Sequence, residues 1–375
     1  MDFLEYQGKA VLAEAGLPTP AGRYCETVDE VVAAVQELGP CAVKAQVPTG
    51  KRGKAGGIRL VANAQEAAAA AADILALTIG GHEVAGLLVE QQIKIARELY
   101  AAVMNDLSAR TPLLLFSTQG GMDIEEVAAN NPEAICRIPV PMDGTLDTAR
   151  LEQALAALDL DDALRPSVVR FLQRLHALYL EKDLELLEIN PLAVLEDGTL
   201  VALDCKLTVD DSALFRQPDL AGRGAPERRT ELEERGVQNG LKYIELDGNV
   251  GVLANGAGLT MTTMDVISHF GGSPANFLEI GGDAYTKGEA ALQLVLADPK
   301  VKSLVINFCG AFARTDVMTE GIVAAWEVLK PEIPVFFSVH GTGEDRAVEI
   351  LESRLGVTPH DRMEDAVAAA VEAAQ

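Results

Sequence analysis

The chain has 375 residues, of which 49% are hydrophobic and 5% aromatic. This length exceeds what one ordinary hydrophobic core encloses and predicts an α/β protein of at least two domains. The formal net charge of -25 repels nucleic-acid backbones and anionic lipid surfaces, so neither is expected as a partner.

The cysteine pattern and the hydropathy pattern both favour a cytoplasmic protein. The five cysteines lie mostly in apolar runs without CxxC spacing, which predicts buried free thiols rather than disulfides or zinc ligands. No stretch reaches the roughly 18 consecutive apolar residues of a membrane span. The start MDFLEYQGKAVLAEAG is amphipathic and charged, unlike an export signal. We therefore expect neither export nor membrane insertion.

Residues 1–240 are expected to form an α+β domain. Helix-like and β-rich runs alternate irregularly there, which is typical of antiparallel pairing. The helix-like runs are 28–39 and 64–77, and the β-rich runs are 85–93 and 111–117. The stretch 215–236, rich in Pro, Gly and charge, breaks this pattern and is the predicted linker. We place the domain boundary near residue 240.

A basic, glycine-rich loop follows an apolar strand within this region. In AVKAQVPTGKRGKAGGIRL the strand carries Lys44, and the loop contains Gly50, Lys51, Arg52, Gly53, Lys54, Gly56 and Gly57. Glycines let backbone amides approach phosphate oxygens, and Lys and Arg supply charge that this acidic chain otherwise lacks. The loop predicts a polyphosphate-binding flap, although a merely solvated basic loop has the same composition. It does not match GxxxxGK[ST], which excludes a Walker-type P-loop.

The run LELLEINPLAVLEDGTLVALDCKL predicts two paired strands that bring oxygen ligands together. Glu196, Asp197 and Gly198 would form the turn. Glu188 and Asn190 would lie on one strand and Asp204 on its neighbour. Asn190 and Asp204 then suit a magnesium ion, which takes few protein oxygens together with phosphate and water. The alternative is structural: Asn before Pro is often a turn residue, and Asp204 could cap the strand end.

The second half of the chain alternates strands and helices regularly. The expected strands are 248–255, 275–280, 301–308 and 334–339, and the expected helices are 259–270, 288–298, 317–329 and 344–355. This alternation requires a parallel sheet covered by helices on both faces. NGAGLTM at 255–261, with Glu279 after the next strand, is close to a dinucleotide fingerprint. It lacks the third glycine and has Met261 where a small residue is needed, which argues against nicotinamide binding.

Taken together, the order and spacing of these motifs resemble the β subunit of succinyl-CoA synthetase along essentially the whole chain. The motifs are the basic loop, EINPL with its downstream LDCK, and GNVGVLANGAGLTMTTMDVISHFGGSPANFLEIGG. The resemblance implies an ATP-grasp nucleotide-binding domain at 1–240 and a flavodoxin-like, doubly wound CoA-ligase domain at 241–375. It also implies Mg²⁺, ATP or GTP, and a partner α subunit that carries a phosphohistidine and most of the CoA site, in an αβ or α2β2 assembly.

The resemblance also assigns contacts to individual residues. Nucleotide contacts fall on Lys44, Lys51, Arg52, Gly53, Glu90, Ile93 and Glu98; metal ligands on Asn190 and Asp204; and substrate contacts on Asn255, Ala311, Phe312 and Ala313. No catalytic residue is expected in this chain, because the resemblance implies that the partner's histidine accepts the γ-phosphate. The histidine then passes it to a small dicarboxylate such as succinate, and the CoA thiol displaces it.

Several positions depart from the family pattern. Ala311 and Phe312 follow Gly310 where a Gly-Gly pair is typical, Ser338 and His340 stand where Arg and Glu are common, and the loop reads GKRGK rather than GGRGK. The added bulk leaves malate-CoA ligase and citryl-CoA synthetase as alternatives. Two further alternatives are a non-catalytic nucleotide-binding paralogue and an ATP-grasp ligase that needs no partner.

Overall fold

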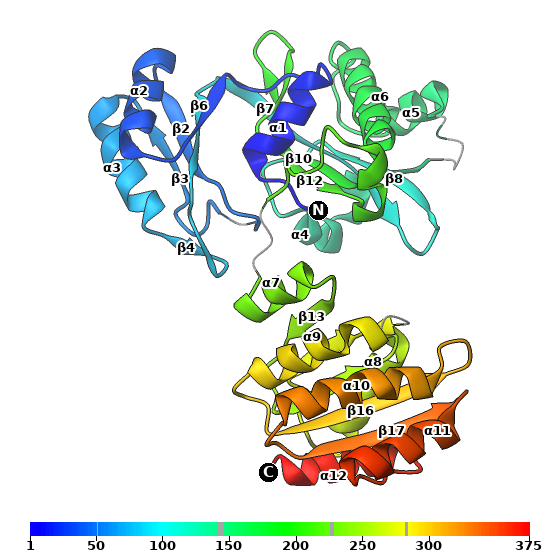
Figure 1. Cartoon of the computed structure of the whole chain (residues 1–375). Helices are drawn as coiled ribbons and strands as arrows, with labels where there is room; N and C mark the ends of the chain where they lie inside the picture. The colour runs from blue at the N-terminus through cyan, green and yellow to red at the C-terminus, as the bar shows by residue number, and fades with distance from the viewer. Residues whose placement is uncertain (51, 141–143, 145, 226–228, 282–283) are drawn as a thin grey trace. The chain divides into compact units, whose positions relative to one another are not determined.

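The computed structural model describes residues 1–50, 52–140, 144, 146–225, 229–281 and 284–375. The chain divides into two compact units, Met1–Pro226 and Glu227–Gln375 (Figure 1). This division precedes the predicted boundary near residue 240, because helix α7 (Glu231–Gln238) packs against strand β13 (Lys242–Glu245) and belongs to the second unit. A capping box between Thr230 and Glu233 starts α7 inside the predicted linker.

The first unit contains two larger antiparallel sheets. The smaller has the strand order β1-β6-β2-β3, and the other has the order β11-β10-β7-β8-β9 with β12 beside β10. The strands are β1 (Gly22–Cys25), β2 (Cys41–Ala45), β3 (Ile58–Val61), β6 (Leu87–Gln91), β7 (Ile95–Asp106), β8 (Thr111–Ser117), β9 (Ile135–Pro139), β10 (Leu184–Leu195), β11 (Leu200–Ala202) and β12 (Lys206–Val209). A short pair, β4 (Thr78–Ile79) and β5 (His82–Glu83), stands apart. The expected antiparallel character of this region is confirmed.

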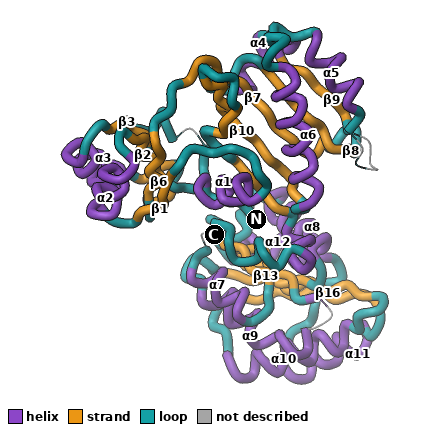
Figure 2. Tube along the Cα trace, turned by 90° about the horizontal axis from the view of Figure 1, so that it is seen from above, coloured by secondary structure: helices purple, strands orange, loops and turns teal. Residues whose placement is uncertain are grey.

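Helices α2 (Val28–Leu38) and α3 (Ala64–Leu75) cover one face of the smaller sheet (Figure 2). Both begin where the sequence predicts, because Thr27 and Asn63 accept hydrogen bonds from the first helical N–H groups. Their apolar stripes bury Val31 and Ile74 against the sheet. The result is a small independent core beside the basic loop.

The larger sheet holds the main core of the first unit. Helices α1 (Glu5–Glu14), α5 (Thr148–Ala156) and α6 (Arg165–Glu181) contribute apolar side chains to one face. Helix α4 (Ile124–Asn130) packs on the other face. Because α1 lies next to β12, its residues reach the middle of β10, where Asn190 lies, and Asp204 just before β12.

The second unit is the expected doubly wound domain, with one difference. Its sheet order is β13-β15-β14-β16-β17, and all pairs are parallel except β13 with β15. The other strands are β14 (Val250–Ala254), β15 (Asn276–Glu279), β16 (Ser303–Gly310) and β17 (Val335–Gly341). The sequence analysis missed the antiparallel edge strand β13.

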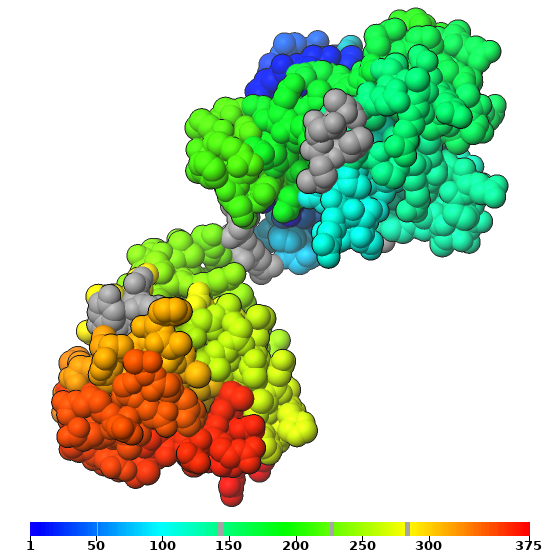
Figure 3. Space-filling view, turned by 90° about the vertical axis from the view of Figure 1, so that its right-hand side faces the viewer, coloured from blue at the N-terminus to red at the C-terminus, as the bar shows by residue number. Residues whose placement is uncertain are grey.

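Helices cover both faces of this sheet. They are α8 (Ala257–His269), α9 (Ala284–Ala297), α10 (Thr315–Leu329), α11 (Glu344–Ile350) and α12 (Met363–Ala373). Helices α9, α10 and α11 line one face of the sheet, and α8 and α12 line the other. In the space-filling view the unit is one continuous body (Figure 3). The predicted helix 344–355 ends early as α11 and continues as a π-helical turn. Helix α12 was not predicted.

All five cysteines are free, as expected, but they are not all buried: Cys136 is half-buried and Cys309 is exposed. None of the helices in the described ranges has the length and apolar character needed to cross a membrane.

Candidate functional site

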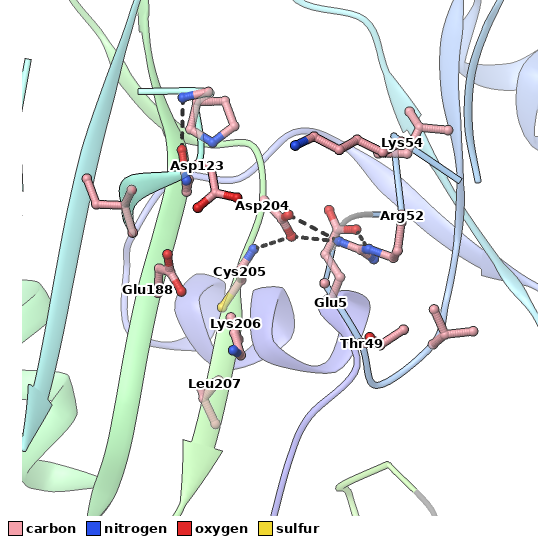
Figure 4. A pocket seen from close by; sticks show the side chains of 18 of the residues that line it. Glu5, Thr49, Arg52, Lys54, Asp123, Glu188, Asp204, Cys205, Lys206 and Leu207 are labelled. Atoms are coloured by element: carbon pink, nitrogen blue, oxygen red, sulfur yellow. Dashed lines mark hydrogen bonds and ion pairs between the residues drawn. The ribbon is translucent and has the colours of Figure 1, made fainter. Parts of the chain in front are cut away.

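A cavity of about 610 Å³ lies between the basic loop, the middle of β10 and the start of β12. The polar residues of its wall are Asp2, Glu5, Thr49, Arg52, Lys54, Asp123, Glu125, Glu188, Asn190, Asp204 and Lys206. Among the predicted site residues, Arg52, Gly53, Asn190 and Asp204 line this cavity. In Figure 4, Arg52 and Asp204 point toward each other and Glu5 lies beneath them. The fold thus brings together residues of the loop and of the EINPL strand that are far apart in sequence.

The guanidinium of Arg52 joins the loop to the strand end. Its Nη2 lies 2.9 Å from Oδ1 and 3.1 Å from Oδ2 of Asp204. Its Nη1 donates to the carbonyl of Ala45 (3.1 Å) and forms an ion pair with Oε2 of Glu5 (2.8 Å). Burial by itself would lower the pKa of Arg52, but Glu5 and Asp204 raise it. Arg52 is therefore a fixed cation at the cavity wall.

The loop around Arg52 is held mainly by its own backbone. The N–H of Gly57 donates to the carbonyl of Arg52 (2.9 Å), and the N–H of Gly56 donates to that of Gly53 (3.2 Å). Gly56 has φ +77°, and a Cβ on Gly57 would lie 2.7 Å from Ile79 Cδ1. These glycines shape the loop, and their amides are already used inside it. Lys51, another predicted contact, lies outside the described residues.

Asn190 lies within β10, not in a turn, and its amide is oriented by a neighbouring loop. Its Oδ1 accepts the N–H of Gly121 (2.8 Å), and its Nδ2 donates to the carbonyl of Met122 (2.9 Å). An amide oxygen has a second lone pair, which stays available for a cation. Glu188 lies two residues earlier on β10. Burial raises the pKa of its carboxyl group, and the positive charge of Lys206 partly opposes this rise.

Lys44 and Glu90 lie behind the cavity in a buried ion cluster. We define the ion cluster as Glu5, Lys9, Lys44, Arg52, Glu90 and Asp204. Nζ of Lys44 lies 2.6 Å from Oε2 of Glu90 and 2.9 Å from Oε1 of Glu5. Burial would lower the pKa of Lys44, but the carboxylates of Glu5 and Glu90 raise it. Gly22 faces Glu90 across the β1–β6 ladder. A Cβ there would lie 2.8 Å from Glu90 Cγ, so the glycine leaves room for this side chain.

The remaining predicted nucleotide contacts lie beside the cavity rather than in its wall. Ile93 is half-buried in the connection between β6 and β7. Glu98, near the start of β7, accepts the N–H of Gly120 at its backbone carbonyl (3.1 Å). Its carboxylate lies against Gly121, where an added Cβ would be 2.0 Å from Oε2. Glu98 therefore touches the same loop that orients Asn190.

Sequence reasoning missed Glu5 and Lys9, which are charged but only 3% and 5% exposed. They stand four residues apart on α1, a spacing that is typical of exposed ion pairs on helices. Their burial is therefore visible only in the folded structure.

The predicted substrate residues lie at the carboxyl ends of adjacent parallel strands in the second unit. Nδ2 of Asn255 donates to the carbonyl of Cys309 and Oδ1 accepts the N–H of Cys309, both at 2.8 Å. Asn255 thus joins the end of β14 to β16. Ala311, Phe312 and Ala313 form the turn that follows β16, and ligands of open α/β sheets bind at such ends. Phe312 projects entirely into solvent, with an exposed fraction of 102%.

Comparisons with known proteins identify the family. An ATP-grasp domain model matches residues 2–194, and a CoA-ligase model matches residues 253–371. The succinate–CoA ligase [ADP-forming] β subunits of Natronomonas pharaonis and Haloarcula marismortui are 41% and 42% identical, with 100% of this chain and 99% of each relative covered. This chain belongs to the succinate–CoA ligase β-subunit family.

The solved structures agree with this family in fold. ATP citrate lyase from Methanothrix soehngenii, in complex with citrate and coenzyme A, matches with a TM-score of 0.77 and 23% identity, and covers 99% of both chains. A D541A ATP citrate lyase from Methanosaeta concilii, with citryl-CoA, gives 0.78 and 22%. The predicted arrangement of an ATP-grasp half and a CoA-ligase half is confirmed. In this member of the succinate–CoA ligase β-subunit family, the cavity lies in the ATP-grasp half.

Proposed function

We propose that this protein is the nucleotide-binding β subunit of an ATP-dependent succinate–CoA ligase of the cytoplasm. The observation that carries the proposal is the cavity in the ATP-grasp half, where Arg52, Lys54, Asn190 and Asp204 meet. Two cations and two oxygen ligands around one space suit a nucleoside triphosphate with its divalent ion. GTP is the alternative nucleotide.

Asn190 and Asp204 fit a magnesium ion by their chemistry. Together they offer an amide oxygen and a carboxylate, and Mg²⁺ takes few protein oxygens beside phosphate and water. Phosphate oxygens and water would supply the remaining ligands. The ion would neutralise charge on the phosphate oxygens. A bound phosphate would also compete with Asp204 for Nη2 of Arg52 and free the Asp204 carboxylate.

The chain's own residues would position and neutralise, and the nucleophile would come from a partner. Arg52 at the cavity wall and Lys44 behind it would neutralise the phosphate charge while a histidine of an α subunit attacks the γ-phosphorus and ADP leaves. The phosphohistidine then transfers its phosphoryl group to a carboxylate, and the CoA thiol displaces phosphate from the acyl phosphate. The ends of β14 and β16, joined by Asn255, would face this second half-reaction, in an αβ or α2β2 assembly.

The test is reconstitution with the cognate α chain. We expect CoA-dependent ADP release with succinate. Malate, citrate and itaconate are tested as alternative acids, because Phe312 stands at the substrate turn. Asn190→Ala and Asp204→Ala should abolish phosphorylation of the α chain while leaving the fold intact. Asp159→Ala, a change at a fully exposed carboxylate of the same unit, is the matched control.

Each outcome has a distinct meaning. Wild-type phosphorylation by Asp204→Ala would refute the metal assignment. Nucleotide binding without phosphorylation of the α chain would favour the non-catalytic paralogue. Acyl-phosphate formation by the chain alone, trapped with hydroxylamine, would favour the ligase that needs no partner.

A further inference from the structure

Two buried charges on helix α1 hold the predicted phosphate-binding cations in place. Oε1 of Glu5 lies 2.8 Å from Nζ of Lys9 and 2.9 Å from Nζ of Lys44, and its Oε2 lies 2.8 Å from Nη1 of Arg52. These three cations come from three different segments: α1, β2 and the basic loop. Burying a carboxylate is unfavourable unless it is paired, and Glu5 is paired with all three.

Lys9 extends the same contacts to the opposite side of the site. Its Nζ lies 2.6 Å from both carboxylate oxygens of Glu90 and 2.8 Å from the carbonyl of Leu203. Lys44 donates to that carbonyl as well, at 2.7 Å. Leu203 directly precedes Asp204, so α1 is tied to both the nucleotide side and the metal side of the predicted site.

The ion cluster is balanced in charge. It contains three carboxylates and three cations, all within ion-pair distance of another member. Lysine side chains are flexible and can point their charge in many directions. Since Glu5 contacts both Lys44 and Arg52, it holds the charged groups of both side chains in place relative to the cavity.

We propose that Glu5 and Lys9 are positioning residues for the nucleotide site: Glu5 fixes Arg52 at the cavity wall and Lys44 behind it, and Lys9 keeps Glu5 and Glu90 in place. This inference rests on the proposed nucleotide site. Neither residue needs to touch the nucleotide. Glu5 acts through the two cations, and Lys9 acts through the two carboxylates.

The experiment compares Glu5→Gln, Lys9→Met and the double variant in the full chain with its α partner. Glu14→Gln is the matched control, because it is the same change on the same helix, at an exposed ion pair with Arg223. Affinity for Mg-ADP is measured by calorimetry, stability by denaturant unfolding, and KM for ATP and for CoA by steady-state kinetics.

The single variants leave the ion cluster with one unbalanced charge, whereas the double variant restores neutrality. Positioning therefore predicts that the double variant regains stability while its affinity for Mg-ADP stays about tenfold or more below wild type, the effect of losing a group that orients a ligand-binding side chain. The KM for ATP should rise and the KM for CoA should not. The double variant also keeps the test valid if Glu5→Gln alone does not fold.

Two results would overturn the proposal. Recovery of Mg-ADP affinity together with stability in the double variant would make Glu5 and Lys9 mere charge partners. Wild-type affinity in Glu5→Gln would exclude any positioning. If wild type binds Mg-ADP, Asp204→Ala weakens it and Glu5→Gln does not, only this proposal fails. If wild type itself does not bind, the proposed function fails as well.

Discussion

Gly8 and Cys205 form a packing pair beneath the predicted metal ligand, and we predict that their substitutions are coupled. Gly8 lies in the middle of α1, and a Cβ added there would lie 2.8 Å from Sγ of Cys205. Cys205 is buried and directly follows Asp204, whose Oδ1 accepts the Cys205 N–H at 2.8 Å. Relief of the clash in Gly8→Ala would therefore shift Asp204.

The magnitudes follow from two opposing effects. Alanine in place of a helical glycine gains about 1 kcal/mol of helix propensity, but overpacking a closed core costs about 1–3 kcal/mol. Gly8→Ala should therefore destabilise the first unit by up to about 2 kcal/mol. In Gly8→Ala/Cys205→Ala the sulfur is gone, the nearest remaining Cys205 atom is Cβ at 3.5 Å, and the helix gain is kept. We expect a favourable coupling of about 1–3 kcal/mol.

The assay is denaturant unfolding of wild type, both single variants and the double variant, followed by far-UV circular dichroism. The sole tryptophan, Trp326, lies in the second unit, so its fluorescence transition is an internal control that should not shift. Affinity for Mg-ADP should fall in Gly8→Ala and recover in the double variant. Free energies that add within about 0.5 kcal/mol would show independent sites and refute the predicted clash.

Three further predictions concern other parts of the chain. Burial lowers the pKa of His176, so unfolding takes up a proton as the pH falls below the ordinary value of about 6.5. The His176→Leu variant should therefore lose less stability than wild type between pH 7 and pH 5, and equal losses would contradict this prediction. The buried side chain of Asn276 forms hydrogen bonds with both the N–H and the C=O of Val252. Asn276→Ala should therefore lower the free energy of unfolding by about 1–3 kcal/mol for each group left unpaired, and an unchanged unfolding midpoint by Trp326 fluorescence would disprove this. In Gly310→Ala the Cβ would lie 1.9 Å from the Ala313 carbonyl oxygen; CoA ligation should fall while phosphorylation of the α chain persists, and normal ligation would separate this turn from the second half-reaction.

Local patterns predicted helices α2 and α3 and most elements of the second unit, because periodicity and capping act over a few residues. Thr27 and Asn63 start helices where the sequence indicates, and the regular alternation after residue 248 gave the correct parallel sheet. Two of the missed elements had weak local signals. Strand β13 is a four-residue edge strand, and α7 begins inside a stretch whose charge and glycine content favour a linker.

The candidate site was only partly accessible from sequence. The loop and the EINPL strand indicated a phosphate and metal site, and the structure places Arg52, Asn190 and Asp204 around one cavity. Glu98 and Ile93 lie beside that cavity rather than in its wall. The position of Glu98 depends on its contacts with Gly120 and Gly121, which residue type does not encode.

By itself, the sequence determined the two-part α/β organisation, the family, and the residue types able to hold phosphate and a cation. These depend on local periodicity, composition and motif order. The tertiary structure decided which charges are buried together: Glu5 and Lys9 have the spacing of a surface helix pair, yet they are buried with Lys44 and Glu90. Burial and charge pairing arise from packing between segments distant in sequence, so they appear only once the chain is folded.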